Sequence, residues 1–415
     1  MSTVPLTFDD LDRVLDPDEI WSQCIFFGSE IVGIRHEPCW GTSVLQWMLD
    51  EVSGKEIQLL GPNSQALSRD ELAKIRNTLT GAALCLLPAE MFARPSPNEV
   101  IEHRTQLLVE QRAWPDVASN GCAFVLCADH LVSARPRLSK ADSNKRYLLP
   151  HRLYPDPQTS LPTDWAGFNK LLIDLVQAVC ARPMQPTWTD PALETAIPTI
   201  LHELFKNTHD HARTWWDGTQ PKHSLRGIVC NYYELCDLDY IAKHSRSKVL
   251  DPASSYIREL LDIAKEGRTT QSLQSATIKG FIELSVFDSG PGFVGCSTKN
   301  DPTSLSAQRQ LEIVRQCLRK GYSSTDNETR GFGLSKVLSR LRRAKGFIRI
   351  RTNAVSGYRS FARFNELETI KSLDTEATYD RLLDWRNLYS PRQTIYRSLR
   401  GAIVTVLIPM SDIDG

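Results

Sequence analysis

An apolar segment that ends in a glycine-rich turn constrains this chain most. The segment FIELSVFD (281–288) is a strand candidate, and Ser-Gly-Pro-Gly follows it directly. Glycine allows the backbone to turn and lets another group approach it closely. The sequence therefore predicts a strand whose last residue, Asp288, leads into a tight turn. Taken alone, this pattern is equally typical of an ordinary strand ending.

A polar helix face is the second feature. The apolar spacing predicts a helix at about 198–212, starting at a break caused by Pro198. Glu203, Asn207 and Asp210 are spaced i, i+4 and i+7, so they share one face of it. The carboxylate could take a proton from water, and the carboxamide oxygen could ligate magnesium. A solvated helix face would show the same spacing.

A third feature is the glycine pair in RGFGLSKVL (330–338), which precedes a helix predicted at 334–345. Backbone N–H groups at a helix N-terminus bind phosphate readily. The segment has neither the GxxxxGK[ST] pattern of a P-loop nor a complete GxGxxG, because position 336 is lysine. On its own, a GxG before a helix is a weak signal.

The order of these features resembles the GHKL superfamily. This family includes sensor histidine kinases, DNA gyrase B subunits, MutL proteins and heat-shock chaperones. HELFKNTHDHA (202–212) resembles its N box, DSGPG its first glycine box, and GYSSTDNETRGFGLSKV (321–337) its later glycine box with the ATP lid. A late strand near Gly401 completes the order. The resemblance covers roughly 195–410 and nothing before it.

The resemblance implies a role for each matching residue. Glu203 would orient or deprotonate the attacking water as general base, and Asn207 would hold Mg²⁺. Asp288 would bind adenine, with Gly290 and Gly292 shaping the pocket. Asp210 matches an acidic position common in the gyrase and MutL branches. The backbone of the glycine box would contact the phosphates (Gly331, Gly333, Leu334), and three hydroxyl residues would lie in the lid (Ser323, Ser324, Thr325).

These roles imply a protein that binds ATP and Mg²⁺, either as an ATPase or as an ATP-driven switch. Two alternatives stay open: a protein kinase of the histidine-kinase or anti-sigma type, and a nucleotide-binding module without turnover. Two departures matter. Ala402 stands where the family often has threonine, and the spacing indicates insertions near 237–275 and 366–396.

The expected architecture has two parts. Residues 1–160 would form a mixed α/β domain, with AALCLL (82–87) and GCAFVLCA (121–128) as strand candidates. Residues 161–190 would be a linker and connecting helix. Residues 191–415 would form a two-layer α/β sandwich of the Bergerat ATP-binding type, with a mixed sheet and helices on one side.

Composition says little about partners. Lys plus Arg and Asp plus Glu both number 49, so net charge indicates neither nucleic acid nor an anionic membrane as partner. We expect a cytoplasmic protein that acts with a protein partner or as a homo-oligomer. A basic run could bind nucleic acid, although a solvated face fits it as well (Arg340, Arg342, Arg343, Lys345, Arg349, Arg351). Three histidines could suggest a metal cluster or phosphoacceptor, but they lie on the proposed nucleotide helix (His202, His209, His211).

Overall fold

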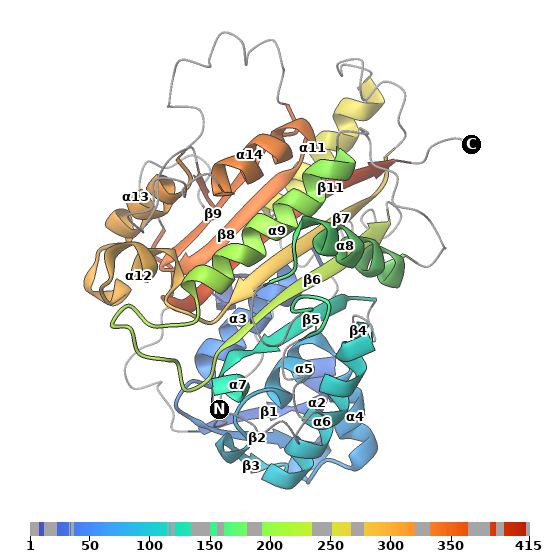
Figure 1. Ribbon diagram of the computed structural model, residues 1–415, viewed down its shortest axis with the longest axis vertical. Coiled ribbons are helices and arrows are strands. Elements are labelled where there is room, and N and C mark those ends of the chain that lie inside the picture. Colours follow the sequence, from blue (N-terminus) through green and yellow to red (C-terminus); the bar gives the residue numbers. More distant parts are fainter. Residues whose placement is uncertain are drawn as a thin grey trace.

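The computed structural model describes most of the chain. The described residues are 8–11, 23–32, 34, 37–113, 116–117, 121–133, 150–155, 162–180, 193–234, 251–266, 278–319, 333–363, 382–386 and 394–411. Within them the strands form two sheets, one of eight strands and one of three. Figure 1 shows the large sheet in the upper part of the molecule and the small one below it.

The large sheet has the order β10-β9-β8-β11-β7-β6-β5-β4. Its strands are β4 (Asp116–Val117), β5 (Ala123–Ala128), β6 (Leu225–Glu234), β7 (Ile278–Asp288), β8 (Phe347–Asn353), β9 (Val355–Ser360), β10 (Leu383–Asp384) and β11 (Leu399–Ser411). All neighbouring strands of this sheet are antiparallel. The expected mixed sheet is therefore wrong: β7 and β8 do run parallel, but β11 inserts between them and pairs antiparallel with both.

Alternation along β7 gives the sheet two different faces. Ile282, Leu284 and Val286 belong to the core beneath the helices that face the viewer in Figure 1, which we call the front face. Phe281 and Phe287 point to the back face and join separate clusters there. Successive side chains of a strand point to opposite faces. Asp288, two residues after Val286, therefore lies on the front face.

The front face is covered by helices. These are α8 (Trp165–Val179), α9 (Leu193–His211), α12 (Gly292–Thr298), α13 (Ala307–Cys317) and α14 (Gly333–Arg343) (Figure 1). Asp164 caps α8 by accepting the Gly167 N–H at 2.9 Å. The apolar stripes of these helices pack on the sheet in one continuous core.

Helix α9 runs through Pro198, so the expected break there is wrong. A proline inside a helix costs about 3 kcal/mol. The stripe of buried side chains around and after it outweighs that cost, since each contributes about 1.5–3 kcal/mol. These side chains are Ile197, Ile200, Leu201, Leu204 and Phe205.

The N-terminal part covers the back face. It contains α1 (Phe8–Leu11), α2 (Gly28–Val32), α3 (Trp40–Glu51), α4 (Arg69–Arg76), α5 (Leu79–Cys85), α6 (Pro97–Ala113) and α7 (Asp129–Ser133), with the parallel strands β1 (Gln23–Phe27), β2 (Glu56–Leu60) and β3 (Phe92–Arg94). Short 3₁₀ turns lie at Pro62–Ser64, Ala89–Met91 and Pro302–Ser304. Helix α11 (Pro252–Glu266) packs on the back face too, in a cluster with Phe281 and Phe347.

The segment 82–87, expected as a strand, lies mostly in helix α5. Thr78 caps this helix by accepting the Gly81 N–H at 3.0 Å. A short, wholly buried apolar run has no periodicity that separates strand from helix. Alanine and leucine, with no β-branched residue in the run, favoured the helix.

The expected division at residue 160 does not follow the sheet. Strand β5 pairs with β6 along its whole length, and β4 extends the sheet beyond it. Helix α8, expected as a connector, is part of the front core through Phe168, Leu171 and Leu175. Because the N-terminal part also covers the back face, the sheet lies between two helical layers. Within the described residues, no helix is long and apolar enough to cross a bilayer.

Candidate functional site

Helix α9 orients the polar residues singled out in the sequence. Its buried side chains, such as Leu204, Phe205 and Thr208, face the sheet, which turns Glu203 and Asn207 toward the neighbouring helix α14. Both of these side chains are half-buried. Asp210 is held by Lys206 one turn earlier, with Lys206 Nζ 2.6 Å from Asp210 Oδ2.

The start of α14 lies against these two side chains. A β-carbon at Gly333 would lie 3.0 Å from Glu203 Oε2 and 3.7 Å from both the Nδ2 and Oδ1 atoms of Asn207. A larger residue at position 333 would therefore crowd them. Leu334 is buried in the front core and anchors the first turn of the helix. Ser323, Ser324, Thr325 and Gly331, the other expected phosphate and lid residues, lie outside the described residues.

Asp288 lies at the end of β7, where the turn begins. Its Oδ1 atom accepts the Gly290 N–H at 2.9 Å, and the residue is 8% exposed. Loss of hydration raises its pKa to about 7, although the Gly290 amide, the Arg226 charge and the Ala402 amide act in the opposite direction. Near neutral pH, this carboxyl group is therefore poised between its charged and neutral forms.

The glycines of the turn allow close backbone contacts. A β-carbon at Gly290 would lie 2.6 Å from the Ala212 carbonyl oxygen, just after α9. Gly292 has φ +72°, and a β-carbon there would lie 2.6 Å from both Thr352 Oγ1 and Asn353 Oδ1. These contacts are within the protein. Because these glycines have no side chain, the turn packs directly against the end of α9 and the β8–β9 hairpin. This packing determines the position of Asp288.

Ala402 lies directly opposite Asp288 in β11, and Thr352 lies opposite Ala402 in β8. The Thr352 hydroxyl donates to the Gly401 carbonyl at 3.0 Å and accepts the Phe293 N–H at 3.1 Å. It therefore anchors α12 to the strands. Thr352 thus carries a hydroxyl in β8, opposite Ala402 of β11, the position where the GHKL family often has threonine.

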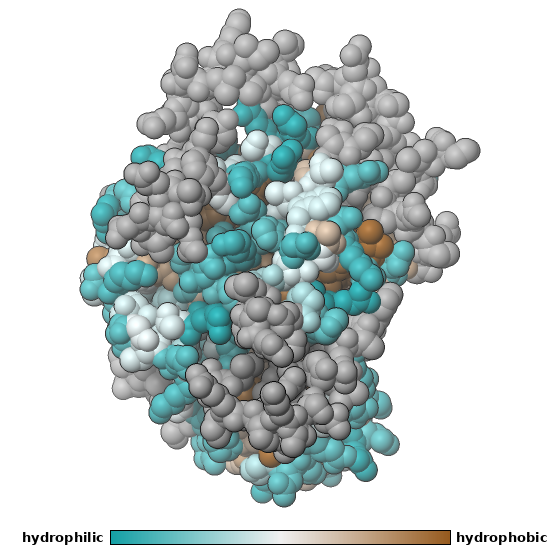
Figure 2. All heavy atoms as spheres, in the orientation of Figure 1, coloured by the Kyte–Doolittle hydropathy of each residue, from teal (hydrophilic) through white to brown (hydrophobic). Residues whose placement is uncertain are grey.

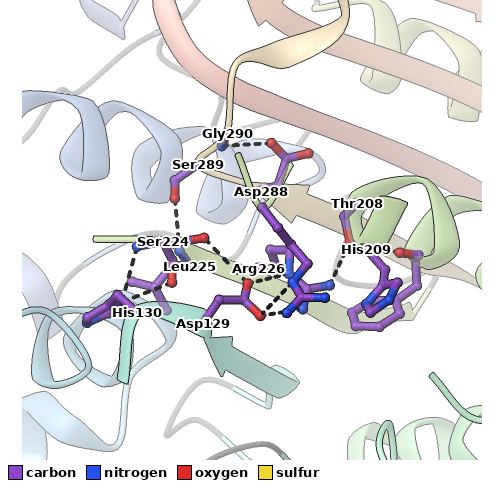
Figure 3. A network of polar contacts seen from close by, with 12 residues as sticks. Asp129, His130, Thr208, His209, Ser224, Leu225, Arg226, Asp288, Ser289 and Gly290 are labelled. Carbon is purple, nitrogen blue, oxygen red and sulfur yellow. Dashed lines mark hydrogen bonds and ion pairs between the residues drawn. The ribbon is translucent and has the colours of Figure 1, made fainter. Parts of the chain in front are cut away.

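A buried network beside Asp288 was not anticipated from the sequence (Figure 3). Arg226 faces Asp288 across β6 and β7 and is fully buried. It donates to both carboxylate oxygens of Asp129, at 2.6 and 2.7 Å, to the Tyr154 hydroxyl at 2.7 Å and to Thr208 Oγ1 at 3.4 Å. Burial alone would lower the pKa of Arg226, but the bonds to Asp129 raise it above its usual value.

This network joins α9 to residues that precede position 160. Asp129 begins α7, Tyr154 precedes α8, and Thr208 belongs to α9. The arginine inside the apolar segment LRGIVC could have indicated a buried polar network, since an arginine is rarely fully buried without a partner. Its partners could be found only once the strands were paired.

The three histidines of α9 do not gather into a metal site. His202 packs on Phe168, with ring centroids 5.2 Å apart, and His209 Nδ1 lies 3.1 Å from the Tyr154 hydroxyl. Burial, helped by the positive charges of Arg226 and Arg213, lowers the pKa of His209 to about 4, so it is neutral at pH 7. Among the described residues, no group of three or more His, Cys, Asp and Glu side chains could hold a metal ion.

Two further features near the site escaped the sequence analysis. Trp215 and Trp216 follow α9 with ring centroids 5.3 Å apart, and Arg400 lies over the Trp215 ring. Lys336 on α14 forms an ion pair with Glu203. The sequence shows Lys336 three residues after Gly333, but it does not show that Lys336 pairs with Glu203, because the two residues lie far apart in the sequence.

Comparisons with known proteins do not place the chain in a family. No protein-family model matches it, and the searches of curated proteins and of solved structures found no match.

Proposed function

We propose that the chain binds ATP with Mg²⁺ between α9, α14 and the turn after β7, in the manner of GHKL proteins. One observation carries the proposal: three motifs far apart in sequence meet along one helix. Gly333 lies over Glu203 and Asn207, and Gly290 lies against Ala212 just after the end of the same helix. These contacts are about 14 Å apart along the helix, at 1.5 Å per residue, a span suited to a nucleotide with its phosphates.

In this proposal, Asp288 recognises the base. Its ionised carboxylate accepts a hydrogen bond from the adenine amino group. Its burial supports the role, because a desolvated acceptor distinguishes an amino group from a carbonyl oxygen strongly. The tight turn through Gly290 and Gly292 holds this acceptor in place.

At the other end of the site, Asn207 would hold Mg²⁺ through its amide oxygen, and the cation would supply positive charge beside the phosphates. The amides at the start of α14 bind the phosphates. Glu203 is then placed as the general base for hydrolysis. No step requires a second protein ligand for the metal.

The Bergerat-type fold belongs to the same proposal. The front face, with α9 and α14 lying side by side on an antiparallel sheet, supports it. The back face adds a layer, because α3 packs on β7 and β11, the strands that bear Asp288 and Gly401. A switch would use this contact, since a shift of these strands on nucleotide binding reaches the N-terminal part directly.

Incubation with ATP labelled on its γ-phosphate separates the candidate activities. We expect free labelled phosphate, which indicates an ATPase. Labelled protein would instead indicate a kinase, and recovery of unchanged bound ATP a binding module. If equilibrium dialysis detects no retention of ATP with Mg²⁺, the proposal of a nucleotide site is wrong.

A further inference from the structure

An ion pair links the proposed general base to α14. Lys336 Nζ lies 3.0 Å from Glu203 Oε1, while Oε2 of the same carboxylate faces Gly333. The lysine side chain is 55% exposed and the glutamate side chain 18%. The Glu203 carboxylate thus rests on the first turn of α14, at the place where the proposed function puts the terminal phosphates.

We infer that Lys336 is the residue that recognises the terminal phosphate, and that in the empty protein it holds Glu203 inactive. The inference rests on the proposed function and extends it. Without nucleotide, the ammonium group neutralises the carboxylate and occupies one of its oxygens. When ATP binds, the γ-phosphate takes over the ammonium group and Glu203 is released.

The exchange is physically favourable. A partly exposed ion pair contributes little to stability, so it is broken easily. A terminal phosphate carries more negative charge than a carboxylate and offers more acceptor oxygens to an ammonium group. Lys206, on the same helix as Glu203, is paired with Asp210, whereas Lys336 is paired with Glu203 itself and is more than half exposed.

Release of Glu203 would couple phosphate recognition to chemistry. The freed carboxylate accepts a proton from the attacking water as the water oxygen bonds to the γ-phosphorus. The bond from that phosphorus to the bridging oxygen breaks, and its electron pair stays on ADP. Lys336 stays with the phosphoryl oxygens, where negative charge is concentrated. An empty site therefore keeps its base neutralised.

An ion pair that only holds α9 and α14 together would place the same two residues side by side. The test must therefore distinguish a structural ion pair from phosphate recognition. Calorimetric titrations with ATP, ADP and AMP in Mg²⁺ would compare the parent with Lys336→Met, Lys336→Arg and the control Arg340→Met. Arg340 is one turn further along the same outward face, which is largely hydrophilic over α9 and α14 (Figure 2), so the control removes an equal charge.

We expect Lys336→Met to weaken ATP binding at least tenfold, ADP binding less than threefold, and AMP binding not at all. Lys336→Arg should restore most of the preference for ATP over ADP, and Arg340→Met should match the parent. Glu203→Gln, which releases the lysine, should bind ATP two- to fivefold more tightly. Loss of an ion pair with a structural role alone would not alter the ratio of ATP to ADP affinity.

If Lys336→Met keeps the parent's ATP-to-ADP ratio, Lys336 does not read the terminal phosphate and the inference is overturned. Equal loss of all three nucleotides in a variant that melts like the parent would overturn it too. If the parent itself binds none of them, the proposed function falls and the inference falls with it. Parent binding with an unchanged Lys336→Met ratio overturns the inference alone.

Discussion

Strand β7 carries two buried carboxyl groups, Glu283 on the back face and Asp288 on the front. Glu283 accepts the Cys39 N–H at 2.6 Å and bonds from Tyr233, Asn231 and Ser285 at 3.1 to 3.4 Å. Asp288 has fewer donors, the backbone amides of Gly290, at 2.9 Å, and of Ala402. Burial raises the pKa of both groups.

The difference separates a carboxylate whose oxygens are taken up by protein donors from one that can still accept a further hydrogen bond. The oxygens of Glu283 are occupied by protein donors, so it fastens α3 to the sheet. Arg349 of β8 strengthens the same contact, because it donates to the hydroxyl of Ser43 in α3. Asp288 is also buried, but with fewer protein donors it keeps acceptor capacity. Burial and a raised pKa alone would have selected both.

The largest expected effect is the loss of nucleotide binding when Asp288 of β7 is replaced. Asp288→Asn should weaken ATP binding by a hundredfold or more, on the scale of losing a buried hydrogen bond to a charged group. The amide nitrogen would present a donor in place of the acceptor. Calorimetric titration with ATP and Mg²⁺ measures this effect. Normal binding by Asp288→Asn would remove the family assignment itself.

Glu283→Ala should show the reverse pattern. The variant leaves the Cys39 amide without its acceptor and opens a cavity, so the free energy of unfolding should fall by about 3 kcal/mol. ATP affinity, measured well below the melting temperature, should stay within about twofold of the parent's, the scale of neutral distant changes. A large loss of affinity would mean that the back face belongs to the site.

Glu203→Ala tests the front face further. Turnover should fall roughly a hundredfold or more, the usual scale for loss of a general base, while ATP binding should not weaken and should tighten by no more than is expected of Glu203→Gln. Phosphate release at saturating ATP provides the measurement. Turnover equal to the parent's would exclude Glu203 as the base and leave a binding module or another base.

The two states of Asp288 should also appear in stability. Its folded pKa, about 7, exceeds the ordinary value of 3.8, so its stabilising contribution is complete below about pH 4 and is lost as the pH rises through 7. Between pH 5 and pH 8 the parent should therefore lose about 2.6 kcal/mol of unfolding free energy relative to Asp288→Asn. Urea unfolding at both pH values checks this; parallel curves would place the pKa of Asp288 near its ordinary value.

The smallest effect should come from Asn207→Ala. Removing one of several magnesium ligands should weaken ATP binding about tenfold when Mg²⁺ is present. In EDTA the variant and the parent should bind ATP equally. A loss that persists in EDTA would show that Asn207 contacts the nucleotide itself or supports α9.

Much of the front layer could be predicted from the sequence because its signals are local. Helical spacing around Glu203 and Asn207 identified α9, and the apolar run ending at Asp288 identified β7. Local signals also misled. The fully buried run at 82–87 had no period, and Pro198 indicated a break that the packing of α9 overcame. In both places burial, which depends on the whole fold, decided the outcome.

The sequence by itself determined the elements that bear the motifs and their order along the chain. Only the tertiary structure decided which residues meet: Arg226 with Asp129, Glu203 with Lys336, and Glu283 with the Cys39 amide. It also showed that β5, from before residue 160, belongs to the main sheet. The reason is physical. Periodicity and turn preference act over a few residues, whereas buried polar groups take their partners from whatever strand or helix the folded chain brings beside them.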